Sequence, residues 1–114
     1  MKDSLRDNNK EITYDGDMMI NVLKEIEYIL IGLHSMGSYY AEDIEQRRNE
    51  YEKETAAFID NAMITERLAH IRKRLCESFD LELGDDEMDD IERACEDISY
   101  WRKPGDYTTE MWLK

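Results

Sequence analysis

The densest group of side chains that could do chemistry lies between residues 77 and 97. This segment contains eleven carboxylates, beginning at Glu77, and a single cation, Arg93. Like charges at such spacing repel one another, so we expect the cluster to do more than cap a helix. A bound cation or a basic protein partner would offset that repulsion. The acidic residues predicted to bind a partner are Asp80, Glu82, Asp85, Asp86, Glu87, Asp89, Asp90, Glu92, Glu96 and Asp97.

Calcium is the first cation to test against this segment. An EF-hand loop needs oxygen ligands at positions 1, 3 and 5, glycine at position 6 and glutamate at position 12. Counting from Asp80 places Gly84 at position 5, Asp85 at position 6 and Ile91 at position 12. The EF-hand pattern is therefore absent from this segment.

Other metal and catalytic patterns are equally incomplete. The Glu87 to Asp90 spacing, with a degenerate counterpart at 42–45, is what a magnesium-dependent helical nucleotide pyrophosphatase would need, but any acidic helix produces it. Glu66 and His70 share a helix face, and Cys76 and Cys95 are too far apart for a C-x-x-C site. We expect no metal, no cofactor and no enzymatic activity, and the pyrophosphatase is kept only as a remote alternative.

The amino-acid composition limits the classes of partner that the chain could bind. The 114 residues include 28 acidic and 15 basic side chains, which gives a net charge of −13. Direct nucleic-acid binding needs a basic footprint, so this balance predicts no nucleic-acid ligand and favours a basic protein surface. The apolar run at 28–33 is too short for a membrane span, and the polar residues 1–10 do not resemble a secretion signal. We therefore expect a cytoplasmic protein of a bacterium or a phage-infected host cell.

Helical periodicity runs through most of the chain and predicts an all-α fold. We expect a single domain, 1–114, in which a small bundle of about three helices spans roughly 17–34, 38–79 and 86–101. Residues 1–10 are expected to be poorly ordered, and the apolar tail 106–114 is expected to dock. The long central helix has apolar stripes on two nearly opposite faces, which change over near Asp60 and Asn61, where the helix could kink.

The two apolar patterns lead to predictions about packing. The first helix has the strongest stripe, running from Met19 to Leu33, and is expected to be the most enclosed element. The second half of the central helix is expected to be covered on both faces. The first half exposes a stripe that a second copy of the chain could cover, so we predict a homodimer interface. That interface would contain Tyr40, Ile44, Tyr51 and Phe58.

These features favour a small non-enzymatic binder or inhibitor with Trp101 and Trp112 as apolar anchors. Carboxylates along a helix can imitate a phosphate backbone and so block a basic nucleic-acid-binding site. In size, charge and predicted helicity the chain is similar to phage or mobile-element inhibitors of host nucleases, including anti-restriction and anti-CRISPR proteins. Two alternatives stay open: an immunity protein or antitoxin that neutralises a basic toxin, and a helical homodimeric adaptor.

Overall fold

The computed structural model describes residues 5–106, which contain helices and connecting loops but no strand. The helices are α1 (Gly16–Tyr40), α2 (Ile44–Asn61), α3 (Ile64–Cys76) and the short α4 (Asp90–Ala94). Residues 12–79 form one compact unit, and residues 5–11 with 80–106 form another. The predicted all-α class and small bundle are confirmed. The expected docked tail from Tyr107 onward lies outside the described residues.

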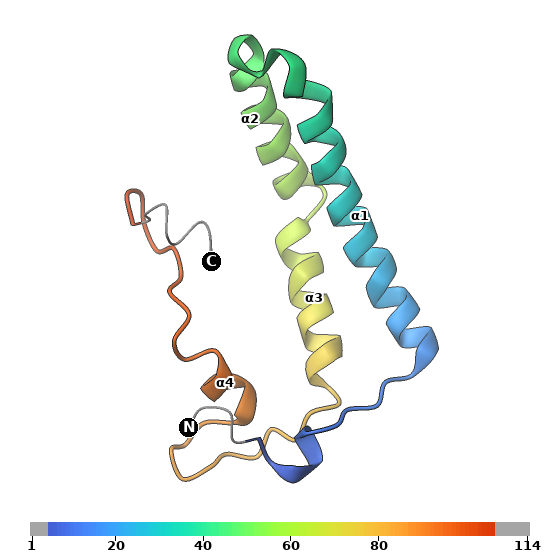
Figure 1. Cartoon of the computed structure of the whole chain (residues 1–114), viewed down its shortest axis with the longest axis vertical. Coiled ribbons are helices and arrows are strands. Elements are labelled where there is room, and N and C mark those ends of the chain that lie inside the picture. Colours follow the sequence, from blue (N-terminus) through green and yellow to red (C-terminus); the bar gives the residue numbers. More distant parts are fainter. Residues whose placement is uncertain (1–4, 107–114) are drawn as a thin grey trace. The chain divides into compact units, whose positions relative to one another are not determined.

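The first unit is a helical hairpin in which α1 runs antiparallel to α2 and α3 in succession (Figure 1). Asp15 caps α1 because its carboxylate accepts a hydrogen bond from the Met18 backbone N–H at 3.0 Å. The helix continues through Gly32 and Gly37, past the end expected near residue 34, and the chain reverses at a 3-10 turn, Ala41–Asp43. At the other end, the Tyr14 hydroxyl donates to the Leu75 carbonyl at 2.8 Å.

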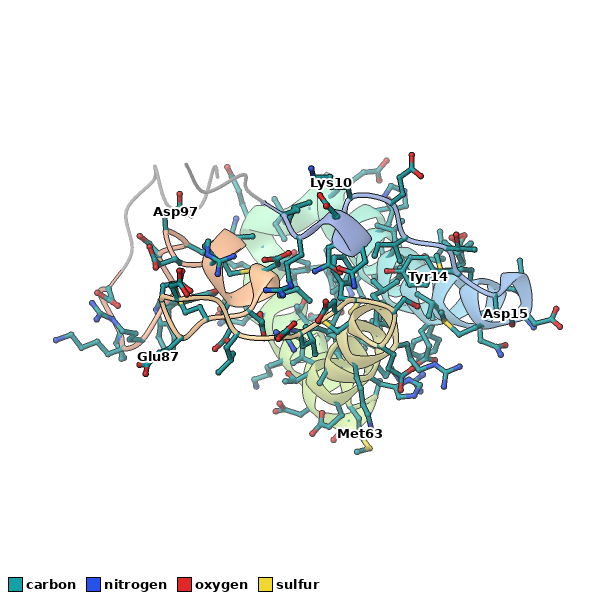
Figure 2. All side chains as sticks on the ribbon, turned by 90° about the horizontal axis from the view of Figure 1, so that it is seen from below. Lys10, Tyr14, Asp15, Met63, Glu87 and Asp97 are labelled. Carbon is teal, nitrogen blue, oxygen red and sulfur yellow. The ribbon has the colours of Figure 1, made fainter. Side chains whose placement is uncertain are left out.

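The central helix is broken at Met63, which adopts the left-handed conformation with φ 55° and ψ 48°. Figure 2 shows the Met63 side chain pointing away from the hairpin, and it is 53% exposed. The break changes the rotational phase of the chain, so Phe58 before it and Ile64 and Ile71 after it pack in one core with Val22 and Ile29 of α1. Residues from both of the apolar stripes predicted on opposite faces therefore pack against α1.

Arg67 holds the break in place through three contacts. Its Nε donates to the carbonyl of Ala62 at 2.8 Å, which satisfies an oxygen left without a helical partner. Its Nη1 donates to Glu25 of α1 at 2.8 Å, and its guanidinium lies over the ring of Tyr28 with 4.3 Å to the ring centroid. One side chain thus joins the end of α2, the start of α3 and the middle of α1.

The apolar stripe of α1 is only partly buried, because Val22 and Ile29 lie in the core whereas Leu23, Leu30 and Leu33 are 52%, 58% and 40% exposed. The packing prediction for the central helix is wrong. The second half of the central helix is covered on one face only, and Leu68 is 50% exposed. The helix expected over 86–101 is also much shorter, because α4 spans only Asp90–Ala94.

Two glycines of α1 offer a matched test of the hairpin packing. A Cβ on Gly32 would lie 2.5 Å from the Phe58 ring, whereas a Cβ on Gly37 would meet nothing within 4 Å. Both alanine substitutions gain roughly 0.5–1 kcal/mol of helix propensity. We expect Gly37→Ala to stabilise the protein and Gly32→Ala to destabilise it by about 1–3 kcal/mol through overpacking. Urea unfolding measures both, and equal stabilisation would contradict the packing of Phe58 on Gly32.

Arg67→Gln tests the junction at the break. It removes the contacts to Glu25 and to the Tyr28 ring, and hydrogen bonds to charged groups contribute about 1.5–3 kcal/mol each. We expect a loss of that order in urea unfolding. Arg48→Gln, an exposed cation on α2 with no described ion pair, is the control and should change stability by less than about 0.5 kcal/mol.

Candidate functional site

The acidic segment folds around the guanidinium of Arg93. Its Nε and Nη2 donate to the two oxygens of Asp86 at 2.7 and 2.9 Å, and its Nη1 donates to Asp90 at 2.8 Å. Its Nη2 also reaches the carbonyl of Met88 at 3.0 Å. Gly84 leaves room for this arrangement, since a Cβ there would lie 2.8 Å from Nη2. Arg93 therefore fixes the loop that precedes α4.

The N-terminal residues supply the second set of partners. Asp90 is 4% exposed and accepts hydrogen bonds from the Arg6 backbone N–H and the Asn9 side-chain amide, both at 2.8 Å. Asn9 is 3% exposed and exchanges two further hydrogen bonds with the Asp80 backbone, at 2.7 and 2.9 Å. The Arg6 guanidinium pairs with Glu82 at 2.7 Å. Arg6 and Asn9, which belong to the segment expected to be poorly ordered, thus contact the acidic residues directly.

A capping box explains where α4 begins. The Asp89 carboxylate accepts from the Glu92 backbone N–H at 2.7 Å, and the Glu92 carboxylate accepts from the Asp89 backbone N–H at 3.0 Å. Each side chain therefore satisfies a backbone donor that the first turn of a helix leaves unpaired.

These contacts stabilise the ionised carboxylates. The hydrogen bond from Arg93 is the main reason that the pKa of Asp86 is lowered. The pKa of Asp90 is lowered chiefly by the hydrogen bond from Asn9, and the pKa of Asp80 chiefly by the backbone N–H of Glu82. All three groups are held as anions by donors within the chain.

The predicted partner-binding residues therefore divide into two classes. Six are used inside the fold: Asp80, Glu82, Asp86, Asp89, Asp90 and Glu92. Asp85, Glu87 and Asp97 are exposed and have no described ion pair, and Figure 2 shows Glu87 and Asp97 at the periphery of this unit. Glu96 is exposed but does have an interaction partner. Trp101 is 53% exposed, and Trp112 lies outside the described residues.

Sequence reasoning missed Arg6, Asn8 and Asn9 as partners of the acidic segment. These residues bond to side chains 72 to 84 positions away in the chain, and no spacing pattern reports contacts at that distance. The only local signal is the Asp7–Asn9 run, whose small polar residues form a 3-10 turn.

Three of the four residues of the predicted dimer interface, Tyr40, Tyr51 and Phe58, have described partners within the hairpin. The Tyr40 ring is 6% exposed, packs edge-on against Tyr51 at 5.8 Å and lies under the Arg47 guanidinium at 4.8 Å. Phe58 packs on Gly32 and Tyr28, and Ile44 is half-buried. Burial raises the pKa of the Tyr40 hydroxyl. A homodimer through these residues stays a prediction; Tyr40 is buried and the other three are half-buried within the chain itself.

Metal ligation finds no support in the part of the chain that the structure describes. Residues 5–106 contain no group of three or more His, Cys, Asp or Glu side chains suited to a metal ion. Cys76 and Cys95 are half-buried free thiols. His70 lines a hollow of about 430 Å³ together with Lys24 and Arg74, on the side of the hairpin where Glu25 and Arg67 meet.

Comparisons with protein-family models, with curated proteins and with solved structures find no match for this chain. Within residues 5–106, no helix combines the length and the hydrophobicity that crossing a membrane requires. The site is therefore interpreted from its own geometry.

The carboxylate network should make the acidic unit sensitive to acid. Because the folded pKa values of Asp80, Asp86 and Asp90 lie below the unfolded value of about 3.9, their contribution to stability is complete above that value. It is lost as the pH falls through the folded pKa values. We expect the hydrogen-exchange protection factors of the Arg6 and Gly84 amides to hold from pH 7 to 5 and to fall below about pH 4. The Ala62 amide, which bonds to Phe58 in the hairpin, is the control.

Asp90→Asn removes the charge but keeps the shape of the side chain. We expect it to lower the protection of the Arg6 amide at pH 7 by at least about tenfold, since hydrogen bonds to charged groups are the stronger ones. Unchanged protection in this variant would show that the charge of Asp90 does not hold the unit together.

Proposed function

We propose that this protein is a small non-enzymatic binding protein whose acidic unit occupies a basic, nucleic-acid-binding surface on another protein. The observation that carries the proposal is the division of its carboxylates. Residues 5–11 and 80–106 contain thirteen acidic and five basic side chains. Arg6 and Arg93 hold four of the carboxylates in place. Asp85, Glu87 and Asp97 then face solvent from a backbone that is already fixed.

A fixed backbone matters because it reduces the cost of binding. Ordering flexible loops and side chains on association consumes part of the interaction free energy, and preorganised groups avoid that cost. Glu87 has φ 64°, a conformation maintained by the backbone bonds from Glu87 N–H to Gly84 and from Gly84 N–H to Met88, at 3.0 and 2.9 Å. Its carboxylate is therefore presented from a defined turn.

Exposed aromatic side chains on the same unit can contribute the apolar part of an interface. Tyr100 and Trp101 are 61% and 53% exposed and lie on the C-terminal side of α4, after residues 95–99. Tyrosine and tryptophan are the residue types most often found to dominate binding energy, whereas carboxylates at the rim act mainly on the association rate. An inhibitor of a host nuclease, made by a phage or mobile element and acting in the bacterial cytoplasm, is the biological role that fits this combination.

The proposal is tested by competition between the protein and duplex DNA for a panel of purified basic nucleases. We expect added DNA to displace the protein from any nuclease that binds it. The affinity of the nuclease for the protein should also fall steeply as the salt concentration rises. In the triple variant Asp85→Asn, Glu87→Gln and Asp97→Asn, association should slow by about tenfold while dissociation changes little, because charges at the rim act through steering.

A charge-matched control separates this site from net charge. The variant Glu45→Gln, Glu52→Gln and Asp60→Asn also removes three negative charges, from exposed side chains of α2 without described ion pairs. We expect it to bind nearly as well as the unmodified protein. If both triple variants lose affinity equally, only net charge matters, and if neither does, the acidic unit is not the binding site.

A further inference from the structure

The hairpin has one side that is apolar and uncovered. On α1, the residues one and four positions after the core residues Val22 and Ile29 are Leu23, Ile26, Leu30 and Leu33. Their exposed fractions lie between 38% and 58%. Alternating steps of three and four residues place them along one edge of the helix, as in helices that pack on other helices.

The same side of the hairpin continues onto the antiparallel helices. An antiparallel pair has approximate two-fold symmetry, so residues at equal offsets from the core residues lie on the same side. At these offsets α2 places Ile59 beside Phe58 and α3 places Leu68 after Ile64, and these side chains are 40% and 50% exposed. We call Leu23, Ile26, Leu30, Leu33, Ile59 and Leu68 the apolar face.

The observed contacts confirm this assignment of sides. Glu25 and Arg67 each follow a core residue, Val22 and Ile64, by three positions, and they form an ion pair at 2.8 Å. Residues at the three-position offset therefore meet on one side of the hairpin, which is polar. The residues at offsets of one and four lie on the other side, and that side is the apolar face.

Charge selects the kind of partner that this face fits. At offsets of one and four from Val22, Ile29, Phe58, Ile64 and Ile71, no residue is acidic, and the only charged side chain is Arg72. In a chain with a net charge of −13, this is a surface on which two copies can approach without opposing carboxylates. A basic partner would find no anion to pair with there.

The size of the face also suits self-association. Six aliphatic side chains of these exposures present an apolar patch on the order of 500 Å², at the upper end of what a monomer leaves uncovered. A stable pair buries roughly 800 Å² on each partner, so the patch and its polar rim are sufficient. Leu23 to Leu33 extend over about 15 Å of helix, a length that suits another helix.

We propose that the apolar face is the contact surface between two copies of this chain, so that two hairpins pack face to face as a four-helix bundle. The proposal rests on the hairpin alone and is independent of the function assigned to the acidic unit. It places the dimer contact on the side of α1 and α3 and not at Tyr40, Tyr51 and Phe58.

Sedimentation equilibrium of the full chain tests the proposal, with two variants that each replace two exposed aliphatic side chains of α1 by lysine. Leu23→Lys with Leu30→Lys places two cations on the apolar face. Ile20→Lys with Ile31→Lys places two cations elsewhere on α1, at side chains that are 52% and 49% exposed. We expect the unmodified chain and the second variant to have twice the single-chain mass of 13.6 kDa at tens of micromolar. The first variant should have the single-chain mass, or dissociate at least about a hundredfold more readily.

Three outcomes would overturn the proposal. The unmodified chain could have the single-chain mass at several hundred micromolar, and this result does not depend on whether a variant folds. The face variant could remain a dimer, or both variants could dissociate equally. If the unmodified chain is a monomer and only the face variant loses its circular dichroism, the face is covered within one chain.

Discussion

The left-handed residue Met63 is the constraint on which the hairpin depends. A continuous helix over 44–76 would direct Phe58 and Ile71 to different faces, so α1 could cover only one of them. The break turns both toward Val22 and Ile29. A left-handed conformation costs a residue other than glycine about 1–2 kcal/mol, and that cost is offset because a second apolar stripe becomes buried. Arg67 then fixes the relation between the two halves by bonding to Ala62 and Glu25.

Much of this arrangement follows from the sequence, but the choice of which apolar stripe is buried does not. Periodicity predicts the helices, the change of face near Asn61 and therefore a kink. It does not predict which stripe is covered, because an apolar stripe has the same pattern whether it packs within the chain or against another molecule. Leu30 is therefore misjudged as a core residue. Gly32 lies within α1, and its missing side chain makes room for the Phe58 ring, a contact that appears only once the hairpin is folded.

The internal contacts of the acidic unit could not be predicted from the sequence for a different reason. Local rules explain the capping box of Asp89 and Glu92, because its partners lie three residues apart. Asp90 is buried against Arg6 and Asn9, which lie more than eighty residues away in the chain. The residue types of these two donors do not by themselves indicate that contact. Charge density in a sequence therefore overstates the number of carboxylates available to a partner. In this chain it includes residues whose pKa values are lowered by internal donors.

The two proposed contact surfaces differ in charge. The apolar face of the hairpin contains no carboxylate that would repel a second copy. The acidic unit presents Asp85 and Glu87 together with the exposed Leu81 and Leu83, at 47% and 57%. The proposed pairing through the hairpins would also double the number of acidic units in each particle. Two linked sites can raise overall affinity by about 10²–10⁴ over one site when both engage the same target. Dimerisation would thus let a weak, salt-sensitive acidic surface compete with a nucleic acid, which presents many charges at once, without any further contact to the target.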